Sequence, residues 1–136
     1  MLRFLIILPL FLLIPACSGP PASSVCRSAD PSLQVTLMFG QTRPDGTPIT
    51  TSGWQDFLSR SITPLFPDGL TVLPGQGQWR GRRDGKITSE PSHLVWIVTR
   101  DTPETARKIS VIRESYKTRF SQQSVGLLAG YGCSSF

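Results

Sequence analysis

Two features of the sequence carry residue types that could do chemistry, and the first is the stretch GQGQWRGRRDG at residues 75–85. Its glycines, glutamines, tryptophan and arginines could hold a phosphate or stack on an anionic ligand. The stretch lacks the lysine and the helix entry of a P-loop, and its glycine spacing departs from G-x-G-x-x-G. Two interpretations stay open. Gln78 and Trp79 contact a ligand at the end of a strand, or the whole stretch is an exposed hairpin tip.

The second feature is His93, the one histidine of the chain and so its one imidazole for acid–base work or metal binding. No serine near it lies in a G-x-S-x-G context, and the nine acidic residues form no evident catalytic pair. We therefore expect no catalytic residue, no metal site and no cofactor. His93 is interpreted as a structural residue, with a ligand contact as the alternative.

The N-terminus predicts export. MLRFLIILPLFLLIPACSG has an early Arg3 and an apolar run over residues 4–14, shorter than the ~20 residues of a transmembrane helix. LIPAC resembles a bacterial lipobox, although Pro15 departs from its usual small or β-branched residue. We expect residues 1–16 to be a lipoprotein signal peptide and Cys17 to carry the acyl chains that anchor the protein. The alternative is an ordinary cleaved signal in which Cys17 is incidental.

The predicted export of the protein changes what its net charge implies. The 136 residues carry a formal net charge of +5, which would suit a nucleic-acid ligand or an anionic membrane surface. An exported protein meets no chromosomal DNA, so we expect no nucleic-acid partner. The residue after Cys17 is not the aspartate linked to inner-membrane retention. The expected location is the cell envelope, facing the periplasm, with the outer membrane preferred where the host has one.

The rest of the chain predicts one small domain. Residues 17–32 are rich in Ser, Pro and Ala and predict a flexible tether, followed by a domain over 33–136. Hydrophobic periodicity then predicts strand, helix, strand, strand, helix, strand. Ser52 and Thr102 are the expected helix caps. This order predicts an α+β, ferredoxin-like βαββαβ fold, a four-stranded antiparallel sheet with both helices on one face.

That topology makes a prediction about the cysteines. Cys26 precedes the first strand and Cys133 follows the last strand. The two strands are expected to be adjacent and antiparallel, so both cysteines would lie at the same end of the sheet. In an oxidising compartment such a pair should form a disulfide. Two free thiols or an intermolecular bridge remain the alternatives.

Several motifs together resemble one family. They are MFGQTRPDG, the W-x-x-F of the first helix, TPLFPDGLTVLPGQGQWR, IRESYKTRFSQQSV and the closing CSSF. These motifs resemble the bacterial domain of unknown function DUF3574 over residues 33–136. The resemblance implies a small exported or lipid-anchored protein without an established activity. It also implies candidate ligand contacts at Arg43, Thr71, Gln78, Trp79 and Tyr116.

Two functions are compatible with these observations, and a purely structural component of the envelope is a third interpretation. The first is a lipid-anchored envelope protein that binds a small ligand or a protein partner. The second is a small enzyme acting on an organic substrate in a cleft where Arg43, Gln78, Trp79 and His93 would converge. Because sheets of this fold often dimerise, a homodimer is one arrangement in which such a cleft could form. A shared fold does not by itself distinguish these functions.

Overall fold

The computed structural model describes residues 24–80 and 85–136. The predicted signal peptide, Cys17 and the first part of the predicted tether lie outside these residues, as do Arg82, Arg83 and Asp84 of the hairpin tip. The elements, in chain order, are η1 (Ser24–Ser28), β1 (Asp30–Gly40), α1 (Thr51–Phe57), η2 (Leu58–Ile62), η3 (Thr63–Leu65), β2 (Thr71–Arg80), β3 (Ile87–Thr99), α2 (Pro103–Phe120) and β4 (Gly126–Ser134). None of the helices in the described ranges is long and apolar enough to cross a membrane.

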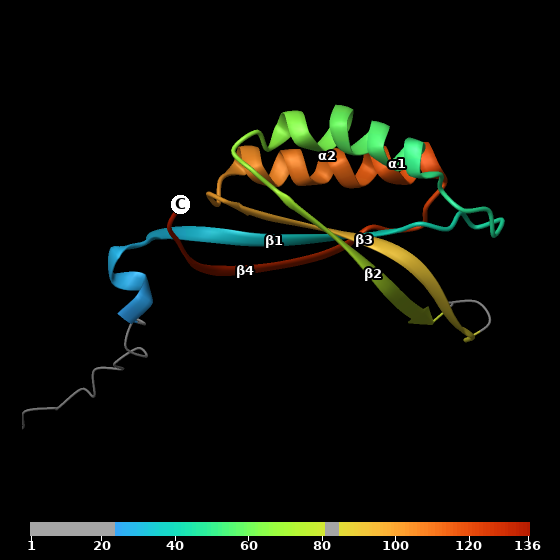
Figure 1. Cartoon of the computed structure of the whole chain (residues 1–136), viewed down its shortest axis with the longest axis horizontal. Coiled ribbons are helices and arrows are strands. Elements are labelled where there is room, and N and C mark those ends of the chain that lie inside the picture. Colours follow the sequence, from blue (N-terminus) through green and yellow to red (C-terminus); the bar gives the residue numbers. More distant parts are fainter. Residues whose placement is uncertain (1–23, 81–84) are drawn as a thin grey trace, which may run out of the picture.

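The four strands form one antiparallel sheet in the order β2-β3-β1-β4, and both helices cover the same face of it (Figure 1). The first and last strands are neighbours, from Asp30 opposite Ser134 to Met38 opposite Gly126. The predicted ferredoxin-like fold is therefore confirmed. β1 begins at Asp30, three residues before the predicted start of the domain.

The core lies between the sheet and the helices. Alternate residues of β1 point into it, so Leu33, Val35, Leu37 and Phe39 are buried. The other buried apolar residues come mainly from β3 and the helical segments: Trp54, Phe57, Ile62, Val95, Ile97, Ile109, Ile112, Tyr116 and Phe120. Phe39 and Tyr116 lie at the centre, with ring centroids 4.7 Å apart.

The helices differ from the prediction in two details. Thr50, not Ser52, caps α1, because the Thr50 hydroxyl accepts a hydrogen bond from the backbone N–H of Gly53. On α2, helical spacing in the sequence predicts an apolar stripe of Ala106, Ile109, Ile112, Tyr116 and Phe120, but Ala106 is exposed and Thr105 is buried in its place. One residue further along an α-helix lies about 100° around its axis. Thr105 can be buried because its hydroxyl donates to the carbonyl of Arg100 at 2.8 Å.

A disulfide joins Cys26 to Cys133, which confirms the predicted pairing. Cys26 lies in η1, just before β1, and Cys133 lies in β4 opposite Pro31. The two Cα atoms are 5.5 Å apart, and the bridge closes a loop with a sequence separation of 107. The disulfide ties the segment before β1 to the last strand.

Candidate functional site

The six residues predicted to contact a ligand lie in three separate places. Thr71 begins β2, at the end of the sheet that holds the disulfide. Gln78 and Trp79 lie near the other end of β2. The remaining three, Arg43, His93 and Tyr116, surround the end of β1.

Gln78 and Trp79 belong to a two-stranded ribbon. The pairing of β1 with β3 stops at Gly40 opposite Ser92, whereas β2 and β3 continue to pair as far as Arg80 opposite Ile87. This ribbon projects beyond the helices in Figure 1. Successive strand residues point to opposite faces, so the side chains of Gln78 and Trp79 cannot face one common site. The structure does not bring these two residues together with Arg43 and His93.

Tyr116 anchors the end of β1 to α2. Its side chain is fully buried, and its hydroxyl donates to the carbonyl of Gly40 at 2.7 Å. The same oxygen accepts from Nε2 of Gln41 at 3.1 Å. Burial raises the pKa of the Tyr116 phenol far above its ordinary value of 10.0, with the charge of Glu90 acting in the same direction. The phenol is therefore neutral and serves as a hydrogen-bonded anchor, not as an acid or base.

Arg43 is held by its own loop. Its Nη1 donates to the carbonyl of Pro48 at 3.0 Å, and its guanidinium lies 5.7 Å from the centroid of the Phe120 ring. A carboxylate oxygen of Glu90 accepts from the backbone N–H of Thr42 at 3.1 Å. These contacts fix the loop between β1 and α1, and they account for a half-buried arginine at this position.

His93 lies inside β3, where Phe39 is its neighbour on β1. Its ring packs on Trp54 with centroids 4.5 Å apart. Nδ1 is buried and has no hydrogen-bond partner among the described residues. Burial lowers the pKa of the imidazole below its ordinary value of 6.5, although a hydrogen bond with the Ser92 backbone raises it. His93 is thus a neutral core-edge residue at pH 7.

This placement of His93 predicts a pH dependence of folding. Because the folded state lowers the imidazole pKa, the unfolded chain binds more protons just below pH 6.5. The contribution of His93 to the free energy of unfolding is therefore expected to be fully present above that pH. It should be lost as the pH falls through the imidazole pKa of the folded state. Urea denaturation between pH 7.5 and 5.0 measures it. His93→Gln should flatten the curve in this window; an unchanged slope in that variant would contradict the assignment.

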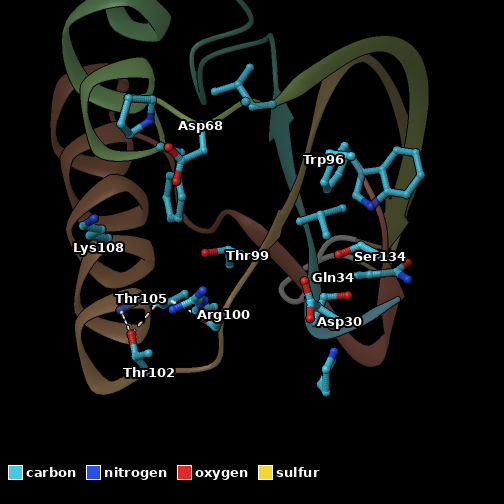
Figure 2. A pocket seen from close by; sticks show the side chains of 18 of the residues that line it. Asp30, Gln34, Asp68, Trp96, Thr99, Arg100, Thr102, Thr105, Lys108 and Ser134 are labelled. Carbon is cyan, nitrogen blue, oxygen red and sulfur yellow. Dashed lines mark hydrogen bonds between the residues drawn. The ribbon is translucent and has the colours of Figure 1, made fainter. Parts of the chain in front are cut away.

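A cleft of about 1070 Å³ lies at the disulfide end of the sheet. Figure 2 shows Lys108 on α2 at one side of the cleft, Asp30 and Gln34 at the other, and Arg100 between them. Its walls come from the start of β1 and β2, the end of β3 and β4, the first turns of α2 and the loop before β2. Apolar surface comes from residues such as Phe66, Trp96 and Val98.

Charged groups of both signs line the cleft. No salt bridge of the described residues involves Arg100, Lys108, Asp30 or Asp68. Lys108 lies over the Phe66 ring at 5.7 Å, which keeps its ammonium beside the cleft. The turn that carries Arg100 is fixed from both sides, since Thr105 binds the Arg100 carbonyl and Thr102 caps α2. Cations and carboxylates therefore stand at one opening without a direct salt bridge between them, although the charge of Lys108 contributes to lowering the pKa of Glu104, another lining residue.

Of the six predicted contacts, this cleft contains Thr71 alone. The other lining residues were missed because they come from four strand ends, α2 and the loop before β2, so no local motif marks the site. Within residues 24–80 and 85–136, no three His, Cys, Asp or Glu side chains gather closely enough to hold a metal ion. The described lining of the cleft thus offers charged side chains and apolar surface.

Comparisons with solved structures concern the fold. A phage SAM lyase in complex with S-methyl-5'-thioadenosine is 14% identical with a TM-score of 0.61, over 73% of this chain and 80% of that chain. CutA1 from Oryza sativa is 14% identical with a TM-score of 0.51, over 79% and 85%. CutA from Synechococcus elongatus, complexed with Bis-Tris, is 12% identical with a TM-score of 0.50, over 79% and 87%. At these identities the likeness shows a shared fold alone.

The comparison that covers the sequence itself is with a protein family. No curated protein matches the chain. The profile of DUF3574, described as a protein of unknown function, matches residues 34–136. This range includes β1 from Gln34 onward, the other three strands, both helices and the lining of the cleft except Asp30, Pro31 and Ser32. The chain therefore belongs to the DUF3574 family.

Proposed function

We propose that this protein is a lipid-anchored component of the bacterial cell envelope whose domain binds a small zwitterionic organic molecule. The observation that carries the proposal is the cleft of about 1070 Å³, in which Arg100, Lys108, Asp30 and Asp68 form no salt bridge with a described residue. Ligand sites typically occupy about 300–1,000 Å³ and combine apolar walls with a few convergent polar groups. The cleft at the disulfide end has a volume near the upper end of this range and combines apolar walls with charged side chains.

The charges suggest what the ligand looks like. Arg100 and Lys108 can pair with a carboxylate or another anionic group, and an arginine can do so with two parallel hydrogen bonds. Asp68 and Asp30 can accept hydrogen bonds from an ammonium group. Phe66 and Trp96 offer apolar surface for the remaining part of a ligand. The phage SAM lyase solved with S-methyl-5'-thioadenosine gives an example of a small molecule held by a protein of this fold.

Binding is tested by the thermal shift of the full chain with free amino acids, betaines, nucleosides and S-methyl-5'-thioadenosine as probes. We expect at least one zwitterionic probe to raise the melting temperature. Arg100→Gln and Asp68→Asn should each lower the affinity for that probe roughly tenfold or more, since a hydrogen bond to a charged group contributes about 1.5–3 kcal/mol. Arg80→Gln is the matched control, because Arg80 is an exposed cation at the far end of β2.

Two outcomes would contradict this proposal. One is a probe whose binding is unaffected by both cleft variants. The other is binding that is lost in Arg43→Ala and Gln78→Ala but kept in Arg100→Gln. That second result would favour the alternative, a small enzyme with its site near Arg43, Gln78 and Trp79.

The anchor is tested separately. Cys17→Ala should move the protein from the membrane fraction to the soluble fraction of the envelope and abolish incorporation of labelled palmitate. The physical reason is that each buried CH₂ of an acyl chain contributes about 0.8 kcal/mol to membrane binding, so two or more chains hold firmly. Cys26→Ala is the control, because Cys26 forms the disulfide. Continued acylation of Cys17→Ala would contradict the proposed anchor.

A further inference from the structure

The face of the sheet that turns away from the helices carries an apolar belt across all four strands. The strand registers place Met38, Leu73, Trp96 and Leu128 on this face, because Met38 and Leu73 flank Leu94 while Leu128 and Trp96 flank Thr36. Their exposed fractions are 37% for Met38, 46% for Leu73, 44% for Trp96 and 63% for Leu128. Exposed apolar surface that is continuous across a sheet marks an interaction site.

Where all four strands lie side by side, at the levels of Thr36 and Met38, this face carries no charged side chain, whereas Asp30 and Glu90 lie on the same face toward its two ends. The uncharged residues that the registers place around the belt are Gln34, Thr36, Gly40, Thr71, Gly75, Ser92, Leu94, Val98, Gly126 and Gly130. The helix layer is different, with salt bridges such as Arg107–Glu104 and Lys117–Glu114 on its surface. A surface that binds anionic lipid needs basic side chains. The belt has none, so its chemistry favours protein over membrane.

A hollow beside Leu128 suggests what kind of protein fits. It has a volume of about 220 Å³ and is lined by Gln34, Thr36, Trp96, Leu128, Ala129 and Gly130. The strongly exposed Leu128 side chain thus stands at the rim of a depression on the same patch. In a two-fold interface each patch meets its own copy, so a projection beside a hollow is self-complementary. Lack of charge also means that two copies of this basic chain would not repel one another there.

The extent of the face is adequate for such an interface. The strands lie about 4.8 Å apart and rise about 3.3 Å per residue, so over their full, staggered lengths they present roughly 600 Å² in projection. A standard interface buries about 800 Å² of accessible surface on each partner, so such an interface would take up most of this face. β4 is also an edge strand, and the sequence from Gly126 to Phe136 contains no charged residue. Edge strands of monomers are commonly protected by charges or prolines.

From the belt, the hollow and the uncharged edge, we propose that a second copy of this chain covers the open face of the sheet, with Leu128 of each copy entering the hollow of the other. The proposal does not rest on ligand binding, although Gln34, Thr71, Trp96 and Val98 lie both on this face and in the lining of the cleft. It predicts that the protein is a homodimer, in which Trp96 and Leu73 become buried at the interface. A different protein seated on this face and a lipid contact are the outcomes that would oppose it.

The test uses a benzophenone amino acid placed at position 128 of the full chain. Irradiation should give a covalent species of twice the monomer mass on a reducing gel. The matched control carries the same probe at position 111, because Val111 lies on α2 and is 45% exposed. In the position-128 background, Leu73→Arg should cut the yield at least tenfold, and the milder Leu73→Gln should reduce it. Val111→Arg should leave the yield unchanged.

Three results would contradict the proposed contact between two copies. Equal dimer yields from positions 128 and 111 would indicate random collision. A position-128 adduct with another protein or with lipid, in place of the dimer, would identify a different occupant. Because Leu73 is nearly half exposed, its variants are expected to fold, which circular dichroism would check. A folded Leu73→Arg variant that still gives the full yield would place the contact elsewhere.

Discussion

Cys133→Ser is expected to lower the free energy of unfolding by up to about 4.7 kcal/mol, the chain-entropy value for a loop of about one hundred residues. The bridge between Cys26 and Cys133 spans a sequence separation of 107 and restricts the unfolded chain. For a small domain, a loss of this size corresponds to a fall in melting temperature of roughly 15–30 °C. Thermal and urea denaturation followed by tryptophan fluorescence would measure it.

The control and the cross-check use the other cysteines. Cys17→Ser, which leaves the disulfide in place, should not change the stability of the domain. Cys26→Ser should destabilise as much as Cys133→Ser, and the double variant should add nothing, because both remove one covalent link. A large difference between the double variant and either single variant would show that the cysteines act other than as a pair.

The fold was predictable because local and global signals agree. The alternation of Leu33, Val35, Leu37 and Phe39 defines one buried face of β1, and Thr102 with Pro103 defines the start of α2. The disulfide followed from topology, since adjacent antiparallel first and last strands place both cysteines at one end. Element order thus carried information about residues more than one hundred positions apart.

Details decided by tertiary contacts were not predictable. The nearly continuous apolar run SHLVWIV is typical of a central strand that is buried on both faces or close to it. Trp96 nevertheless lies on the uncovered face and is nearly half exposed. β3 is central in the sheet, yet the helices cover only one side of it (Figure 1). The apolar pattern of β3 is the pattern of a strand covered on both sides, which agrees with the proposed second copy.

The candidate site was the least predictable part. Arg43, His93 and Tyr116 lie near one another, but their contacts are with the protein itself. The cleft is assembled from strand ends and from α2, and its cations Arg100 and Lys108 belong to no recognisable motif. Sequence patterns report periodicity within an element, whereas a cleft between elements depends on how those elements end.

Tyr116→Phe is expected to lower the free energy of unfolding by about 1–3 kcal/mol, the cost of leaving a buried polar group without its partner. The change removes the donor to the Gly40 carbonyl and the acceptor for Gln41 Nε2. Tyr116→Ala should cost about 3–5 kcal/mol, because it also opens a cavity among packed aromatic rings. The neighbouring rings are those of Phe39, Trp54, Phe57 and Phe120. Urea denaturation at pH 7.5 would measure both variants.

Tyr131→Phe provides the matched control for the hydroxyl of Tyr116. Tyr131 is strongly exposed and its hydroxyl donates to Asp101, so its removal should have little effect on stability. The pair of variants also separates two roles for Tyr116. If it anchors β1 to α2, Tyr116→Phe loses stability and keeps the binding of a thermal-shift probe. If it contacts the ligand, as the family resemblance implies, Tyr116→Phe keeps its stability and loses binding of the probe. We expect the first result, because the hydroxyl is buried between Gly40 and Gln41.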